Sequence, residues 1–204
     1  MLRHSQLVLL GFLLFTAPSW GIVEVRMTYT GLMSDPDKNK IYSGTGKFPE
    51  ARTEYGLGVD VIFDTLIPGI GLGLRYENLG LRYKNYGLHV VSEMSRNALL
   101  LNWRMMHSEY FWGPTLTYGF SHSGGLVTVK ERGAVVTNLE ADRHVSYSAG
   151  LEAGAVLGGF RIGAEAGYMY YEWGDLQGTS GNIPSLNRLD MGGPYLKLLI
   201  GFAI

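Results

Sequence analysis

The sequence alternates between apolar and polar residues with a period of two over most of its length. Leu196–Ile204 shows the pattern clearly, because successive side chains of a strand point to opposite faces. An uncovered hydrophobic strand invites aggregation, whereas a closed barrel in lipid pairs its last strand with its first and leaves no edge. The pattern therefore predicts a barrel strand whose apolar face carries Leu196, Leu198, Ile200, Phe202 and Ile204.

The first 21 residues have the three parts of a secretory signal peptide. A basic start is followed by an apolar run, Leu7–Phe15, and then by small residues that end at Gly21. The apolar run is much shorter than the ~20 residues that a membrane-spanning helix needs. We therefore expect two parts: residues 1–21 as a signal peptide and residues 22–204 as one barrel domain.

Composition excludes several classes of function. The chain has no cysteine, which removes disulfides, thiol nucleophiles and cysteine-based metal sites. Its 17 Lys and Arg nearly balance its 18 Asp and Glu, so charge gives no argument for binding nucleic acid. No later segment approaches ~18 consecutive apolar residues, so helical membrane spans are not expected. The apolar surface of this exported chain must therefore come from strands.

Eight segments alternate in this way, and each is near the ~9–11 residues that cross a bilayer at a tilt. We predict strands at residues 23–30, 54–64, 70–77, 99–105, 112–121, 144–154, 160–171 and 196–204.

Short and long connections follow one another strictly along the chain. Three tight turns are expected at Ile67–Gly69, His107–Glu109 and Leu157–Gly159. Bacterial outer-membrane barrels show this asymmetry of short turns and long external loops. Leu79 is out of phase with the strand before it, which suggests a bulge or the start of a loop, and residues 126–137 could form a hairpin. Ten strands is therefore the alternative count, and the long loops are expected at residues 33–52, 78–96, 122–143 and 174–190.

The alternation does not by itself say which face lies inside. The polar face carries many of the 29 glycines, which suit the narrow lumen of an eight-stranded barrel and would weaken a soluble one. Aromatic residues gather toward the strand ends of the apolar face, as in interfacial girdles. We therefore expect the apolar face to meet lipid, in an all-β, eight-stranded, antiparallel, up-and-down transmembrane β-barrel.

These features together resemble the small OmpA/OmpX-type outer-membrane barrels. The resemblance covers residues 22–204 and implies the outer membrane of a Gram-negative-type bacterium, with no periplasmic domain. It also implies that the last strand is recognised by the barrel assembly machinery. In that family the last residue is usually Phe, whereas here Ile204 is last and Phe202 supplies the aromatic ring.

Charged residues on the polar face should meet in the lumen. Isolated buried ions are costly, so these groups are expected to pair and close the barrel, with Lys197 near Glu24 or Glu165. A small, gated, low-conductance pore is the alternative, and near cancellation of charge disfavours an ion-selective, porin-like channel. The predicted lumen network comprises Glu24, Arg26, Asp60, Asp64, Arg75, Glu77, Arg104, Glu152, Arg161, Glu165 and Lys197.

An enzyme is disfavoured. His144 and Ser146 share the inner face with Glu152, but lipid-modifying barrels place such groups toward lipid, and His122 is expected on the face opposite its neighbouring serines. The five histidines lack the spacing of a metal site, so we expect no catalytic residues, no metal and no cofactor.

The sequence thus predicts an outer-membrane protein with a structural or surface-interaction role. A conduit for hydrophobic ligands is a further alternative, for which Leu100, Met106 and Leu199 are the apolar lumen candidates. Expected partners are outer-membrane lipid, the assembly machinery and an extracellular ligand, host or phage at the loops. We expect a monomer that binds no nucleic acid.

Overall fold

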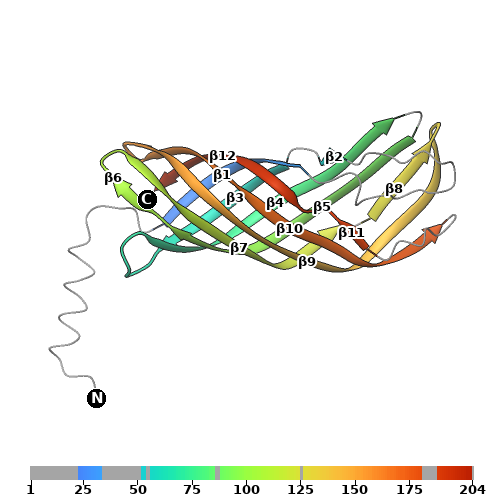
Figure 1. Ribbon diagram of the computed structural model, residues 1–204, viewed down its shortest axis with the longest axis horizontal. Coiled ribbons are helices and arrows are strands. Elements are labelled where there is room, and N and C mark those ends of the chain that lie inside the picture. The colour runs from blue at the N-terminus through green and yellow to red at the C-terminus, as the bar shows by residue number, and fades with distance from the viewer. Residues whose placement is uncertain are drawn as a thin grey trace, which may run out of the picture.

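In the computed structural model, the strands form one antiparallel sheet that closes into a barrel (Figure 1). The structure describes residues 23–33, 52–53, 56–85, 88–124, 126–180 and 188–203. The expected signal peptide lies outside these residues. No helix among them is long and apolar enough to cross a membrane. The strands are β1 (Val23–Leu32), β2 (Arg52–Thr53), β3 (Gly56–Asp64), β4 (Ile70–Asn85), β5 (Leu88–Trp103), β6 (Met105–His107), β7 (Tyr110–Gly124), β8 (Leu126–Glu131), β9 (Ala134–Leu157), β10 (Phe160–Ser180), β11 (Arg188–Asp190) and β12 (Gly193–Ala203).

Eight of these strands, β1, β3, β4, β5, β7, β9, β10 and β12, form the closed wall. Each pairs with the next one along the chain. The ring closes where β12 pairs antiparallel with β1, with Val25 opposite Phe202. The predicted eight-stranded, up-and-down barrel is confirmed, as is the pairing of its last strand with its first. The alternative count of ten strands is wrong.

Short turns lie at one end of the barrel, called the turn end below. They connect β3 to β4, β6 to β7, and β9 to β10, at the three predicted places. All three tight turns hold a residue with positive φ: Gly69 at 79°, Ser108 at 56° and Gly158 at 64°. Glycine reaches such angles without steric cost. The last residues of β12 also lie at the turn end (Figure 1).

The opposite end, called the hairpin end, differs from the prediction. β4 and β5 run on together to Asn85 and Leu88 without any shift of register. The loop expected at 78–96, and the bulge expected near its start, are therefore wrong. Leu79 follows Glu77 by two residues on the same inner face, so the strand keeps its phase and only the polarity of that face changes.

Much of the other expected loops is also strand. β8 and β9 form a hairpin around Arg132 and Gly133, both with positive φ, which confirms the hairpin suggested for residues 126–137. β10 continues to Ser180 and pairs with the short strand β11. The expected loop 33–52 lies almost wholly outside the described residues. These long hairpins extend well beyond the closed wall (Figure 1).

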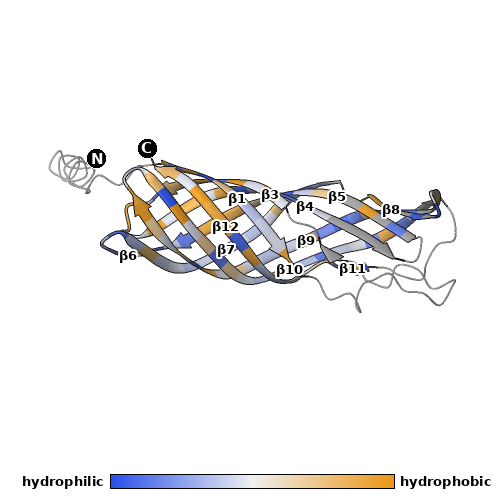
Figure 2. Cartoon of the chain, turned by 90° about the horizontal axis from the view of Figure 1, so that it is seen from above, coloured by the Kyte–Doolittle hydropathy of each residue, from blue (hydrophilic) through white to orange (hydrophobic). Residues whose placement is uncertain are grey.

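The outer surface near the turn end is apolar (Figure 2). Its aromatic side chains form two groups, one toward the turn end and one toward the middle of the molecule. Each of them is 42–64% exposed. The first group contains Phe63, Trp103, Tyr110, Trp112, Phe160 and Phe202, and the second contains Tyr29, Tyr76, Tyr118, Phe120, Tyr147 and Tyr168. The surface that these two groups bound is called the apolar belt.

Candidate functional site: the interior of the barrel

Ion pairs fill the interior near the turn end. Glu24 accepts hydrogen bonds from Arg104 and Arg161. Glu152 accepts hydrogen bonds from Arg104 Nε at 2.8 Å and from Arg26 Nη1 at 2.5 Å. All five side chains are at most 7% exposed. Each carboxylate therefore touches two guanidinium groups, which is how buried charges avoid the cost of being isolated.

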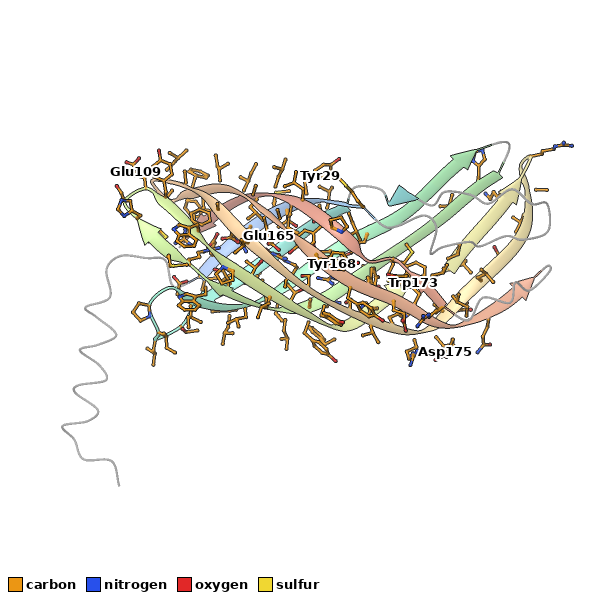
Figure 3. All side chains as sticks on the ribbon, viewed as in Figure 1. Tyr29, Glu109, Glu165, Tyr168, Trp173 and Asp175 are labelled. Carbon is orange, nitrogen blue, oxygen red and sulfur yellow. The ribbon has the colours of Figure 1, made fainter. Side chains whose placement is uncertain are left out.

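Arg75 lies at the centre of the network. Its Nε and Nη2 donate to the two oxygens of Asp60 at 2.8 and 3.0 Å, and its Nη1 and Nη2 donate to Glu165 at 3.1 and 2.7 Å. Glu165 also accepts a hydrogen bond of 2.5 Å from the Tyr195 hydroxyl. Figure 3 shows Glu165 in the middle of the barrel. One guanidinium thus joins opposite parts of the wall through two carboxylates.

Glu77 collects the next set of contacts toward the hairpin end. It accepts hydrogen bonds from Lys197, from Arg96 Nε at 2.8 Å and from the Thr30 hydroxyl at 3.3 Å. Lys197 was expected near Glu24 or Glu165. Glu165 is its cross-strand neighbour, but the ammonium donates to Glu77.

The structure places almost all of the predicted lumen residues inside and adds one to them. Asp64 is the exception: it is exposed at the turn end and makes no ion pair with the described residues. Arg96 is the addition, fully buried between Glu77 and Thr117, and it was missed because it lay in an expected loop. The predicted residues found in the interior are Glu24, Arg26, Asp60, Arg75, Glu77, Arg104, Glu152, Arg161, Glu165 and Lys197.

Beyond Glu77 the interior becomes apolar. On β1 the inner face passes from Thr30 to Leu32, and on β4 it passes from Glu77 to Leu79. A cluster of buried side chains, none more than 6% exposed, fills the space toward the hairpin end. We call this cluster the apolar cap: Leu32, Leu79, Met94, Val127, Leu139, Ala141, Met169, Tyr171, Trp173, Leu189, Met191 and Tyr195.

The three apolar lumen residues proposed from the sequence do not belong to the cap. Leu100 and Leu199 are buried in the wall, 1% and 2% exposed, and Met106 is half-buried near the turn end. Half of the cap residues were missed because they lie in segments expected to be loops: Leu79, Met94, Val127, Leu139, Ala141 and Leu189. On β1, β4 and β5 the signal for cap residues in the sequence was the unbroken phase of the strand, which continues while the polarity of the inner face changes.

A shift in register brings His122 inside the barrel. The pairing of β7 with β5 shifts by one residue between Gly119 and Ser121. Such a bulge sends every later side chain to the other face, so the expected outward position of His122 is wrong. His122 Nε2 lies 2.8 Å from Ser146 Oγ, and Ser146 is fully buried. The change of phase could not be recognised in the sequence, because the residues that follow the bulge, Ser121–Gly124, include no apolar side chain.

Aromatic rings surround this histidine. The His122 ring stacks on His144 with centroids 5.5 Å apart and on Tyr171 at 5.9 Å. His144 in turn meets Trp173 edge-on at 5.9 Å. These rings lie beyond the aromatic residues that end the belt, where the charged interior meets the apolar cap. A methyl group on Gly119 would lie 2.0 Å from Ser146 Oγ, so only glycine leaves room for this arrangement.

A serine hydroxyl bonded to an imidazole is the start of a nucleophilic pair, which also needs a group that orients the base. In the described part of the chain, no carboxylate contacts His122. Glu152, which shares the face of Ser146, is occupied by Arg26 and Arg104. The arrangement therefore resembles a structural contact between wall and cap. The described residues also hold no group of three or more potential metal ligands.

The chain matches no protein-family model and no curated protein sequence. Its class therefore rests on the fold: it is an eight-stranded, up-and-down, antiparallel β-barrel with a filled interior.

Proposed function

We propose that this chain is an integral outer-membrane protein whose barrel is closed and whose hairpin end serves a structural or surface-interaction role. The observation that carries the proposal is the apolar belt. Leu57, Leu99, Leu151 and Ile200 belong to it and are 55–64% exposed. Monomeric soluble proteins rarely expose a continuous apolar surface of this size, whereas a transmembrane barrel requires one.

The height of the belt fits a bilayer. Along β7 the belt runs from Tyr110 to Phe120, a distance of roughly 33 Å at ~3.3 Å per residue. A strand tilt of ~40° reduces this to about 25 Å, the height of the apolar band of outer-membrane barrels. Aromatic rings mark both edges, as expected for side chains at the headgroup level. The belt therefore has the height and the edges of a lipid-facing surface.

The interior supports a closed barrel. The ion pairs occupy the part enclosed by the belt, and the apolar cap fills the part beyond it. An ion would have to displace paired charges and then cross a dry apolar section. We therefore propose that the barrel does not conduct, and that lipid, the assembly machinery and a surface ligand, host or phage are its partners.

Quenching by lipid tests the membrane proposal. Trp103 and Trp112 are 53% and 52% exposed on the belt, whereas Trp173 is 1% exposed inside the cap. In vesicles of lipids brominated on their acyl chains, emission from Trp103 and Trp112 should be quenched strongly and emission from Trp173 weakly, measured with single-tryptophan variants. Equal quenching at the three positions would contradict insertion along the belt.

Conductance tests the closed state. The protein in a planar bilayer should pass no steady current at neutral pH. A stable unitary conductance would instead support the small pore as its function, and the membrane proposal would stand.

A further inference from the structure

The contact between the charged interior and the apolar cap is made by titratable rings. His122 on β7 and His144 on β9 stack on each other. His122 also stacks on Tyr171 of the cap, and His144 meets Trp173 of the cap. Both histidines are half-buried, and the two cap rings are each 1% exposed. The two imidazoles therefore lie directly against two buried rings of the cap.

The charge nearest this pair is positive. Arg96 on β5 is the cross-strand neighbour of His122, and its Nη1 is buried without a hydrogen-bond partner. Its compensating carboxylate, Glu77, lies on the side toward the turn end and is shared with Lys197. No carboxylate among the described residues lies between the two histidines and Arg96 to offset additional positive charge.

The other charged groups nearby face outward or are already bound. Asp142, two residues before His144 on β9, is exposed and accepts a hydrogen bond of 2.5 Å from Gln177. On β10, Glu172 accepts hydrogen bonds from Arg143 and Tyr170. Tyr171, also on β10, is the remaining titratable group against the pair and is neutral at physiological pH. Among the residues that the structure describes, Asp142 is thus the one carboxylate that favours a proton on His144.

We propose that the apolar cap loosens in acid, because protonation of His122 and His144 adds positive charge beside Arg96 in apolar surroundings. Two imidazolium rings cannot remain stacked beside a guanidinium without repulsion, and burial penalises each charge further. The rings would separate and release Tyr171 and Trp173 from the wall. Water would then enter the section that the cap keeps dry.

The direction of the effect follows from the pKa of each ring. Burial, with the charges of His144 and Arg96, lowers the pKa of His122 to about 4, and burial lowers the pKa of His144. In the loosened state both rings meet water and titrate near the ordinary value of ~6.5. The loosened state therefore binds more protons between pH ~6.5 and the lowered values. The cap is fully stable above this window and loses stability as the pH falls through it.

Tryptophan fluorescence tests the proposal. A chain with Trp20→Phe, Trp103→Phe and Trp112→Phe keeps Trp173 as the reporter inside the cap, and a further Trp173→Phe chain gives the background. In lipid vesicles, quenching of Trp173 by acrylamide should increase as the pH falls toward about 4. Each histidine that gains a proton on opening can raise the opening equilibrium constant by up to about tenfold per pH unit.

Histidine variants distinguish the contribution of the two histidines to the acid response from that of the carboxylates, which also titrate in acid. In His122→Gln/His144→Gln the acid response should be largely lost, whereas the matched control His107→Gln, at an exposed turn, should keep it. His144→Gln alone removes a ring whose Nε2 has no hydrogen-bond partner, and it should make the pH dependence shallower. This second variant keeps the test decisive if the double variant does not fold. An unchanged acid response in these variants, or no response in the parent chain, would overturn the proposal.

Discussion

The two parts of β9 differ in which face of the strand is apolar. Near the turn end, Leu151 points outward and is 64% exposed, while Glu152 points inward and is 1% exposed. Near the hairpin end, Leu139 points inward and is 1% exposed, while Glu140 is exposed. Leu139 and Leu151 are an even number of residues apart and still lie on opposite faces, because the alternation is interrupted at Asp142 and Arg143, which are both exposed. The apolar residues therefore change from the outer to the inner face along one strand.

The proposed membrane location would explain the difference. With the belt in lipid, apolar side chains would contact lipid, and the narrow interior takes charges that satisfy one another. With water around the hairpin end, the strands would bury apolar groups inward as in a soluble barrel. Under this proposal the molecule is a membrane barrel joined to an extension with its own apolar core. The two parts should respond differently to the same kind of substitution.

Breaking the central ion pairs should cause the largest loss in the free energy of unfolding. Arg75→Met removes a partner of Asp60, which keeps Arg26, and leaves the buried Glu165 without an ion pair among the described residues, which should lower the free energy of unfolding by about 3–5 kcal/mol. The matched control Arg143→Met removes an arginine that is 60% exposed and should cost less than about 1 kcal/mol. Urea unfolding in vesicles measures both. Equal losses would contradict a network that holds the belt together.

An outward charge should distinguish the two parts of β9 directly. Leu151→Arg places a cation on the belt, where lipid-facing charges cost about 2–4 kcal/mol near the bilayer centre. Glu140→Arg places the same side chain on the outer face of the extension, where surface substitutions usually change stability by less than about 0.5 kcal/mol. Both variants are compared with the parent chain by urea unfolding in vesicles. A tolerated arginine at both positions would contradict the lipid-facing belt.

The sequence predicts the belt well because one rule governs all of it. Eight alternating segments, three short turns and the meeting of the first and last strands all follow from the period of two. The charged residues of the polar face must then lie in the lumen. Their partners were harder to predict, since Lys197 reaches Glu77 from a register position opposite Glu165.

The hairpin end could not be predicted with the same rule. Leu79 appeared out of phase because the apolar side was assumed to face outward along the whole chain. In fact Arg75, Glu77 and Leu79 share one inner face without interruption. His122 was misplaced for another reason, a one-residue bulge that depends on packing against Ser146 and on the absence of a side chain at Gly119. The phase of β4 was therefore readable in the sequence, whereas the change of the apolar face beyond the belt and the bulge in β7 were not.

The smallest predicted effect concerns the junction between the two parts. Ser146→Ala removes the hydrogen bond to His122 Nε2 and should lower the free energy of unfolding by about 1 kcal/mol, the net value of one such bond. Ser121→Ala, at an exposed position one residue from His122, is the matched control and should change little. In Ser146→Ala, backbone amide hydrogen exchange should also become faster in the strand segments that carry the apolar cap. Exchange should stay unchanged in the segments that carry the belt, because the Ser146–His122 hydrogen bond lies at the boundary between the two. If both serine variants unfold alike and exchange alike, the cap is held by its apolar packing alone, and the histidine contact adds nothing to it.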